Sequence, residues 1–99
     1  MVDRRWRLTQ PAADDLDSIY DRSVEAWSVD QAERYVLGLE RLFGLLADFP
    51  GMARLRDEVS PPIRVHPHRS HLVAYREADG GIEVVRILHA RQDWRALLD

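Results

Sequence analysis

Apolar residues recur every three or four positions in two neighbouring stretches of the first half of the chain, the period of an amphipathic helix. The first stretch follows Thr9, a typical helix N-cap, and its apolar positions are Ala13, Leu16, Ile19, Tyr20, Val24 and Trp27. Ser28 and Gln31 form a capping-box pattern that predicts the start of a second helix. Its apolar positions are Ala32, Tyr35, Val36, Leu39, Leu42, Phe43, Leu46 and Phe49, and Pro50-Gly51 ends it. The short connection predicts an antiparallel helical hairpin.

Elsewhere the apolar period is two, which predicts strands. Residues 5–8 form a short first strand, and residues 63–66, 71–76 and 82–89 form three more, the last two joined by a tight Asp-Gly-Gly turn. The connection between the hairpin and these strands contains no predicted element, and the last ten residues form a short helix or turn. The predicted fold class is α+β: an N-terminal strand and an antiparallel helical hairpin packed on a small antiparallel sheet, with residues 1–99 as one domain.

The strand over residues 82–89 is apolar on both faces, which is typical of an interior strand. Strict alternation places Ile82, Val84 and Leu88 on one face and Val85 and Ile87 on the other. Arg86 then lies on the face of Val84, among apolar residues. Because a half-buried arginine needs a carboxylate or backbone partner, we expect Arg86 to be a structural ion pair or a site residue.

Composition and net charge limit the functions that the chain can have. The chain has 99 residues, no cysteine, fourteen arginines with no lysine, and a formal net charge of −3. A net acidic chain argues against sequence-blind nucleic-acid binding, although residues 54–76 are locally basic and suit an acidic partner or a phosphate backbone. For each arginine alone, a solvated surface position is the simpler interpretation. With no apolar leader and no membrane-spanning run, we expect a cytoplasmic protein.

Motifs for catalysis are weak. No glycine-rich phosphate loop and no metal-ligand spacing occur, so we expect no metal and no cofactor. His66, His68 and His71 flank a proline and are expected to be exposed to solvent rather than to converge on a metal. A phosphodiester-cleaving site remains open, because the strands carry a basic group of residues with one candidate acid or base: Arg64, Tyr75, Arg86, His89 and Arg91.

The order of elements, together with the sequence of the last strand, resembles a known family. The chain enters its first helix through Leu8-Thr9 and residues 12–19, and its second half contains the stretches 63–67, 71–76 and 81–93, ending Arg86-Ile87-Leu88-His89-Ala90-Arg91-Gln92-Asp93. This pattern resembles the RelE/ParE superfamily of toxins from bacterial type II toxin–antitoxin systems. The ending is similar to that of the ParE branch.

The resemblance implies one of two activities. RelE-type members are ribosome-dependent mRNA endoribonucleases, whereas ParE-type members poison DNA gyrase by binding and are not nucleases. The absence of lysine, the net negative charge and Ala90 after His89 favour the gyrase inhibitor, which would not be an enzyme. The alternative is a RelE-like endoribonuclease with Arg64, Arg86 and His89 as its catalytic residues. A degenerate, non-toxic interaction module is the third interpretation.

The ParE resemblance also implies two binding surfaces. A ParD-like antitoxin would cover the hairpin and the sheet edge, with Arg64 and Arg76 as charged contacts and, as anchors, whichever of four residues the core leaves accessible: Tyr20, Trp27, Leu42 and Leu46. The expected contacts to gyrase are in the C-terminal segment: His89, Arg91, Gln92, Asp93 and Trp94. The same segment would equally serve as a structural cap with Trp94 closing the sheet. No sequence-specific nucleic-acid binding and no membrane partner are expected.

Overall fold

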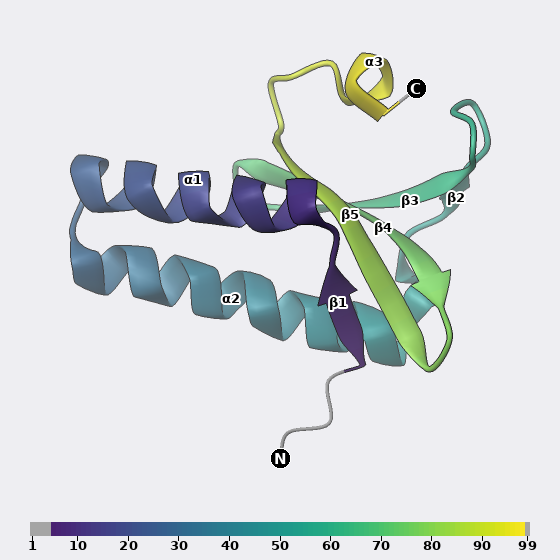
Figure 1. Cartoon of the computed structure of the whole chain (residues 1–99), viewed down its shortest axis with the longest axis horizontal. Coiled ribbons are helices and arrows are strands. Elements are labelled where there is room, and N and C mark those ends of the chain that lie inside the picture. Colours follow the sequence, from purple (N-terminus) through teal and green to yellow (C-terminus); the bar gives the residue numbers. More distant parts are fainter. Residues whose placement is uncertain (1–4, 99) are drawn as a thin grey trace.

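The computed structural model describes residues 5–98, in which a helical hairpin packs on a five-stranded sheet (Figure 1). The elements in chain order are β1 (Trp6–Leu8), α1 (Gln10–Ala26), α2 (Val29–Asp48), the 3-10 turn η1 (Pro50–Met52), β2 (Leu55–Arg56), β3 (Ile63–His68), β4 (His71–Ala78), β5 (Gly81–His89) and α3 (Trp94–Leu98). This is the predicted α+β class. The connection between the hairpin and β3 contains η1 and the edge strand β2, which sequence periodicity missed because two residues show no period.

The sheet order is β1-β5-β4-β3-β2. The predicted strands β3, β4 and β5 pair antiparallel, as expected, and β2 adds antiparallel to β3, whereas β1 adds to the edge of β5 in parallel. A parallel neighbour requires a crossover, and here the helical hairpin and the following strands provide it. The sheet is therefore mixed, with β5 in its interior.

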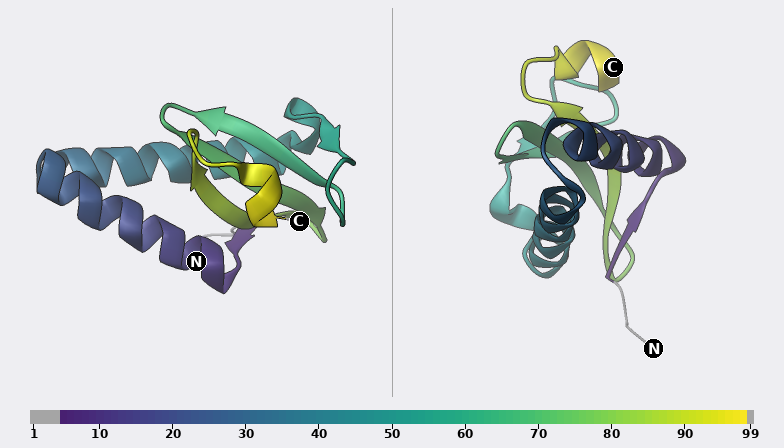
Figure 2. Two further views of the ribbon diagram at one scale, coloured as in Figure 1. Left: turned by 90° about the horizontal axis from the view of Figure 1, so that it is seen from above. Right: turned by 90° about the vertical axis from the view of Figure 1, so that its left-hand side faces the viewer.

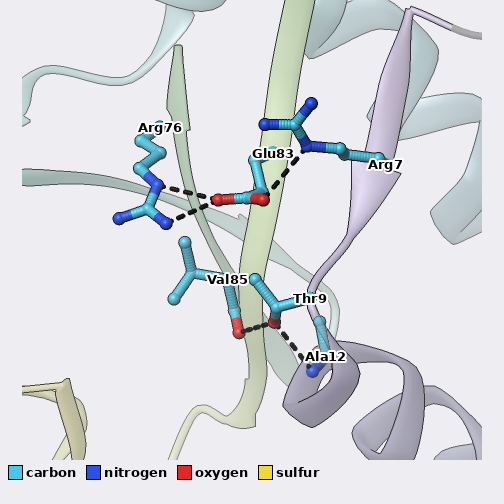
Figure 3. A network of polar contacts seen from close by, with 6 residues as sticks. All are labelled: Arg7, Thr9, Ala12, Arg76, Glu83 and Val85. Atoms are coloured by element: carbon cyan, nitrogen blue, oxygen red, sulfur yellow. Dashed lines mark hydrogen bonds and ion pairs between the residues drawn. The ribbon is translucent and has the colours of Figure 1, made fainter. Parts of the chain in front are cut away.

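Both helices begin where their caps predict. The Thr9 hydroxyl accepts a hydrogen bond from the Ala12 N–H at 3.2 Å and donates to the Val85 carbonyl at 2.7 Å, so the cap of α1 also binds β5 (Figure 3). The Ser28 hydroxyl accepts from the Gln31 N–H at 3.1 Å. The loop between α1 and α2 projects beyond the sheet (Figure 2). No helix among residues 5–98 is long and apolar enough to span a membrane.

Side chains are buried on both faces of the sheet. The helix-facing cluster, the main core, joins Leu39, Phe43 and Leu46 of α2 to Val73, Tyr75, Ile82, Val84 and Ile87 of β4 and β5. On the opposite face a smaller outer cluster contains Val59, Ile63, Val65 and Ala74, and Trp94 and Leu98 of α3 pack against it. In Figure 1, α2 lies below the sheet and α3 above it. The terminal helix therefore covers the outer face, as predicted for a cap.

The alternation along β5 is broken at one residue. Ala74 pairs with Arg86 and Tyr75 pairs with Val84, so Val85 is a bulge without a partner on β4. Beyond the bulge the faces exchange, and Ile87 joins Val84 in the helix-facing cluster. The sequence-based assignment of Ile87 and Val84 to opposite faces was wrong, because strict alternation assumes that every residue of a strand is paired.

Candidate functional site

A groove lies between the two long helices and the part of the sheet formed by the C-terminal end of β5 and the start of β4. It consists of three adjoining cavities of about 410, 540 and 400 Å³. The first and second share Arg22, His71 and His89, and the second and third share Tyr35 and Arg69. We call these three cavities together the basic groove. Its walls are α1, α2, the β3–β4 turn and the end of β5.

Positive side chains dominate the lining of the basic groove. Six arginines and three histidines line it, namely Arg22, Arg34, Arg41, Arg69, Arg86, Arg91, His68, His71 and His89. One carboxylate, Asp15, lines it with them. Because the whole chain carries a net charge of −3, the acidic residues must lie elsewhere on the surface. Such a concentration of one sign of charge attracts an anionic partner.

The arginines of the basic groove differ from the other described arginines in that most of them form no ion pair. Among the described residues, Arg5, Arg7, Arg56, Arg64, Arg76, Arg86 and Arg95 each pair with a carboxylate. The arginines of residues 5–98 without such a pair are Arg22, Arg34, Arg41, Arg54, Arg69 and Arg91. All of these except Arg54 line the basic groove. Its guanidinium groups are thus available to a partner.

Arg86 is the exception within the basic groove. Its Nε and Nη2 atoms donate to the Asp15 carboxylate at 2.7 and 2.9 Å, and this hydrogen bonding raises the pKa of Arg86. The Ile87 N–H also donates to Asp15, at 2.9 Å. The pairing of β1 with β5 ends at Leu8 and Val84. Beyond that point the Asp15 carboxylate, rather than a neighbouring strand, accepts the hydrogen bond of the Ile87 N–H. The ion pair expected for Arg86 is therefore present, and it is structural.

A tyrosine and three histidines form the middle of the basic groove. The Tyr35 hydroxyl lies 2.6 Å from the His71 Nδ1, and the ring centroid of His71 lies 5.5 Å from those of Tyr35 and His89. Burial lowers the pKa of His71, and the nearby His89, His68 and Arg22 lower it further. Burial also lowers the pKa of His68 and raises that of Tyr35. The expectation that His68 and His71 are solvent-exposed was wrong, because both pack half-buried against Tyr35.

The residues expected to contact gyrase divide between two places. His89, Arg91 and Gln92 line the basic groove, and the segment is turned because the Arg91 N–H donates to His89 Nδ1 and the His89 N–H donates to Gln92 Oε1. Asp93 is exposed just before α3. Trp94 lies on the other face of the sheet, against the outer cluster, with the Arg95 guanidinium 4.5 Å from its ring centroid. Trp94 is thus a structural cap.

The residues expected to contact the antitoxin also differ in accessibility. Trp27 is 71% exposed and lines the basic groove, Tyr20 and Leu42 are half-buried, and Leu46 is fully buried in the core and so cannot be an anchor. The two charged candidates already have partners within the chain. Arg64 donates to the Ala53 carbonyl at 2.6 Å and pairs with Glu77, and Arg76 pairs with Glu83 at 2.6 Å (Figure 3).

The candidate nuclease residues come together only in part: Arg86 and His89 line the first cavity of the basic groove, whereas Arg64 does not. Arg64 pairs in register with Tyr75 of the helix-facing cluster, whereas Arg86 pairs with Ala74 of the outer cluster, so the two arginines lie on opposite faces. The buried Tyr75 hydroxyl donates to the Pro50 carbonyl at 2.7 Å and is unavailable as an acid or base. Within the described part of the chain, no group of three His, Cys, Asp or Glu side chains could hold a metal ion.

Four residues of the basic groove were not predicted as site residues from the sequence: Arg22, Arg34, Arg41 and Tyr35. Arg69 belongs to the stretch 54–76, which the sequence marks as locally basic. One signal was present, because Arg34 and Arg41 are seven residues apart and therefore share a face of a helix. Arg22 carries no such signal, since α1 meets the β3–β4 turn only in the folded chain.

Comparison with known proteins identifies close relatives. Residues 6–94 match the family model described as the ParE toxin of type II toxin-antitoxin system, parDE. The chain is 38% identical to Toxin ParE1 of Mycobacterium tuberculosis over 90 residues, which are 90% of this chain and 92% of that protein. It is 33% identical to Toxin ParE1 of Caulobacter vibrioides over 93 residues, covering 94% and 96% of the two chains.

A solved structure is similar in fold. It is titled as the chromosomal ParDE TA system from P. aeruginosa, and it superposes with a TM-score of 0.72 over 85% of this chain and 92% of the other. The sequence identity is 23%, so this likeness concerns the fold alone.

Proposed function

Because the chain belongs to the ParE toxin family of type II toxin–antitoxin systems, we propose that it poisons DNA gyrase by binding it and that a ParD-like antitoxin neutralises it. The proposal concerns the target and the partner, which membership of the family leaves open. Gyrase acts on DNA inside the cell, so the proposal implies a cytoplasmic site of action.

Two observations support a binding poison over a nuclease: Arg64 lies apart from Arg86 and His89, which share the first cavity, and Asp15 neutralises Arg86. A phosphodiester-cleaving site needs its cations and its acid or base around one reacting group. Arg64 is tied to Ala53 and Glu77, Arg86 is tied to Asp15, and the two lie on opposite faces of the sheet. Of the other two candidates, His89 therefore has only Arg86 nearby, and the Arg86 guanidinium is already neutralised.

The proposed target surface is the part of the basic groove nearest to the C-terminal segment. His89, Arg91 and Gln92 line it, and Arg91 forms no ion pair with a carboxylate of residues 5–98. Asp93 adjoins these residues at the exposed start of α3 and belongs to the same proposed surface. The side chains thus offer hydrogen bonds and one unneutralised positive charge to a protein surface.

A supercoiling assay tests the target. Purified wild-type chain is expected to inhibit supercoiling by DNA gyrase, and Arg91→Ala is expected to weaken inhibition about tenfold. Arg54→Ala is the matched control, because Arg54 likewise forms no ion pair within residues 5–98 but lies outside the basic groove, and this variant should inhibit like wild type. Intact supercoiling in the presence of excess folded protein would contradict the gyrase proposal.

The endoribonuclease alternative has its own test. Translating ribosomes programmed with mRNA are incubated with the chain, and cleavage that is abolished by His89→Ala would establish that alternative. Growth during unopposed expression of soluble chain would instead favour a non-toxic interaction module. Co-expression with a ParD-like protein encoded beside the gene is expected to restore growth if the proposed partner is right.

A further inference from the structure

We propose that the second and third cavities of the basic groove bind an unpaired strand of DNA, with its phosphates on arginines and its bases on aromatic rings. The first cavity, which Arg91 and Gln92 line, stays available to a protein target. The assignment of the strand to DNA rests on the proposed function, because gyrase acts on DNA. The strand site adds a second contact, to the DNA itself, beside the proposed contact to gyrase.

Positive charge without a counter-charge lines both cavities. Four arginines contribute it, from α1, α2 and the β3–β4 turn: Arg22, Arg34, Arg41 and Arg69. Within residues 5–98, no carboxylate lines either cavity, and none forms an ion pair with these four arginines. A guanidinium group binds a phosphate through two parallel hydrogen bonds. The lining therefore matches a chain of phosphates.

The net charge of −3 argues against nucleic-acid binding only as an average over the whole chain. Binding responds to the local field, and the folded chain places its unneutralised arginines in one groove. The acidic side chains on the exposed part of α1 lie outside the lining of these two cavities: Asp14, Asp17, Asp21 and Glu25. They repel a strand from the flank of α1 and so confine it to the groove.

Aromatic rings lie among the arginines. Trp27, which is 71% exposed, lines the second cavity, and Tyr35 lines both. His71 lines the second cavity and His68 the third, and each packs edge to face on Tyr35. A base stacks on such rings whatever its identity, but only when it is unpaired and free of its duplex neighbours. The rings therefore favour a single strand over a duplex and predict no sequence preference.

Arg69 stands where the two cavities join. The cavities have volumes of about 540 and 400 Å³, each within the range of small-ligand sites, and Arg69 lines both. One nucleotide in each cavity places the connecting phosphate near its guanidinium group. Arg69 has φ 52°, in the left-handed region that glycine adopts more readily than arginine does. A charged side chain kept in such a strained turn fits a role in binding better than a role in stability.

Fluorescence anisotropy of a labelled oligothymidine of about ten nucleotides tests the site with the toxin alone. For a single strand, the logarithm of the association constant falls with the logarithm of the salt concentration by about 0.7 for each phosphate contacted. Contacts from all four arginines predict a slope of about −3 between roughly 50 and 300 mM salt.

Loss of an arginine should change this slope, and loss of a ring should not. Arg69→Gly suits the turn while it removes a guanidinium group, and it should make the slope shallower by about 0.7. Arg22→Ala with Arg34→Ala should make the slope shallower by about 1.4. Trp27→Ala should weaken binding at least about fivefold at every salt concentration and leave the slope unchanged. Arg54→Ala, outside the basic groove, should keep the affinity and the slope of wild type.

Three results would overturn the strand site: no binding by wild-type toxin at roughly 50 mM salt, equal slopes for wild type and the arginine variants, or a duplex bound as tightly as the single strand. Oligouridine bound more tightly than oligothymidine would reassign the site to RNA. A poly-glutamate peptide bound as tightly would reassign it to an acidic protein. Because the assay contains no gyrase, its failure leaves the gyrase proposal standing, whereas intact supercoiling overturns gyrase as the target and leaves strand binding unaffected.

Discussion

A single carboxylate, that of Asp15, joins the helical hairpin to the sheet through Arg86 and the Ile87 N–H. In Asp15→Asn the side-chain oxygen can still accept from Ile87, but the amide group cannot neutralise the guanidinium, whose side chain is 29% exposed. We expect the free energy of unfolding to fall by about 2 kcal/mol, measured by urea denaturation. Asp17→Asn, on the exposed side of α1, should change it by less than about 0.5 kcal/mol. Equal effects of the two substitutions would show that the ion pair does not stabilise the fold.

His71 makes stability depend on pH. Burial holds the pKa of folded His71 below its ordinary value of 6.5, with His89, His68 and Arg22 acting in the same direction. The unfolded chain therefore binds more protons as the pH falls through about 6.5, and stability is lost on the acid side and retained above about pH 7.5. Glu58 and Glu83, whose pKa values lie below 4.5, lose their contributions only at lower pH.

The prediction for His71 is a decrease in the thermal unfolding midpoint between about pH 7.5 and pH 5.5. His71→Gln should flatten this decrease, because glutamine does not titrate and its side-chain amide can still form a hydrogen bond with the Tyr35 hydroxyl. His68 continues to titrate in the variant, so part of the slope remains. A profile identical to that of wild type would assign the pH dependence to other groups.

At the scale of elements, the short strand β1 depends on its close approach to β5. The Ile82 N–H donates to the Arg5 carbonyl at 2.9 Å, and a Cβ on Gly81 would lie 1.6 Å from that same oxygen. Gly81→Ala must therefore push β1 from the sheet, and we expect a loss of about 3 kcal/mol in denaturation experiments. Gly44→Ala is the control, since a Cβ there meets no atom within 4 Å and should stabilise α2 by about 0.5–1 kcal/mol. Faster hydrogen exchange of the β5 amides should accompany the loss in Gly81→Ala alone.

At the scale of the whole molecule, net charge and local charge predict opposite effects of salt. A chain with a net charge of −3 should repel an acidic protein partner, and salt would then speed their association. The basic groove predicts attraction instead. We expect the association rate constant, measured by stopped-flow fluorescence, to fall about tenfold between roughly 50 and 500 mM salt. The Arg22→Ala, Arg34→Ala double variant should show a weaker dependence, and a rate that rises with salt would refute steering by the groove.

The sequence by itself determined the elements that local physics specifies. Thr9 and Ser28 cap helices because their side chains accept from the backbone N–H groups of the first turn, whatever lies around them. The apolar period of three and four then directs one side of each helix to the core. The turn before β5 and the motif from Arg86 to Asp93 are likewise formed by consecutive residues. The α+β class and the family resemblance could therefore be predicted from the sequence alone.

The tertiary structure alone decided which side chains meet. The bulge at Val85 reverses the faces of β5 because pairing with β4, rather than alternation, sets the register. The basic groove forms because four separate segments of the chain bring Arg22, Arg34, Arg69 and Arg91 together. Most of the other described arginines lie next to carboxylates instead. Charge pairing depends on distances through space, which no period along the chain encodes. The sequence therefore determined how many arginines this protein has, and folding decided which of them are left free to bind a partner.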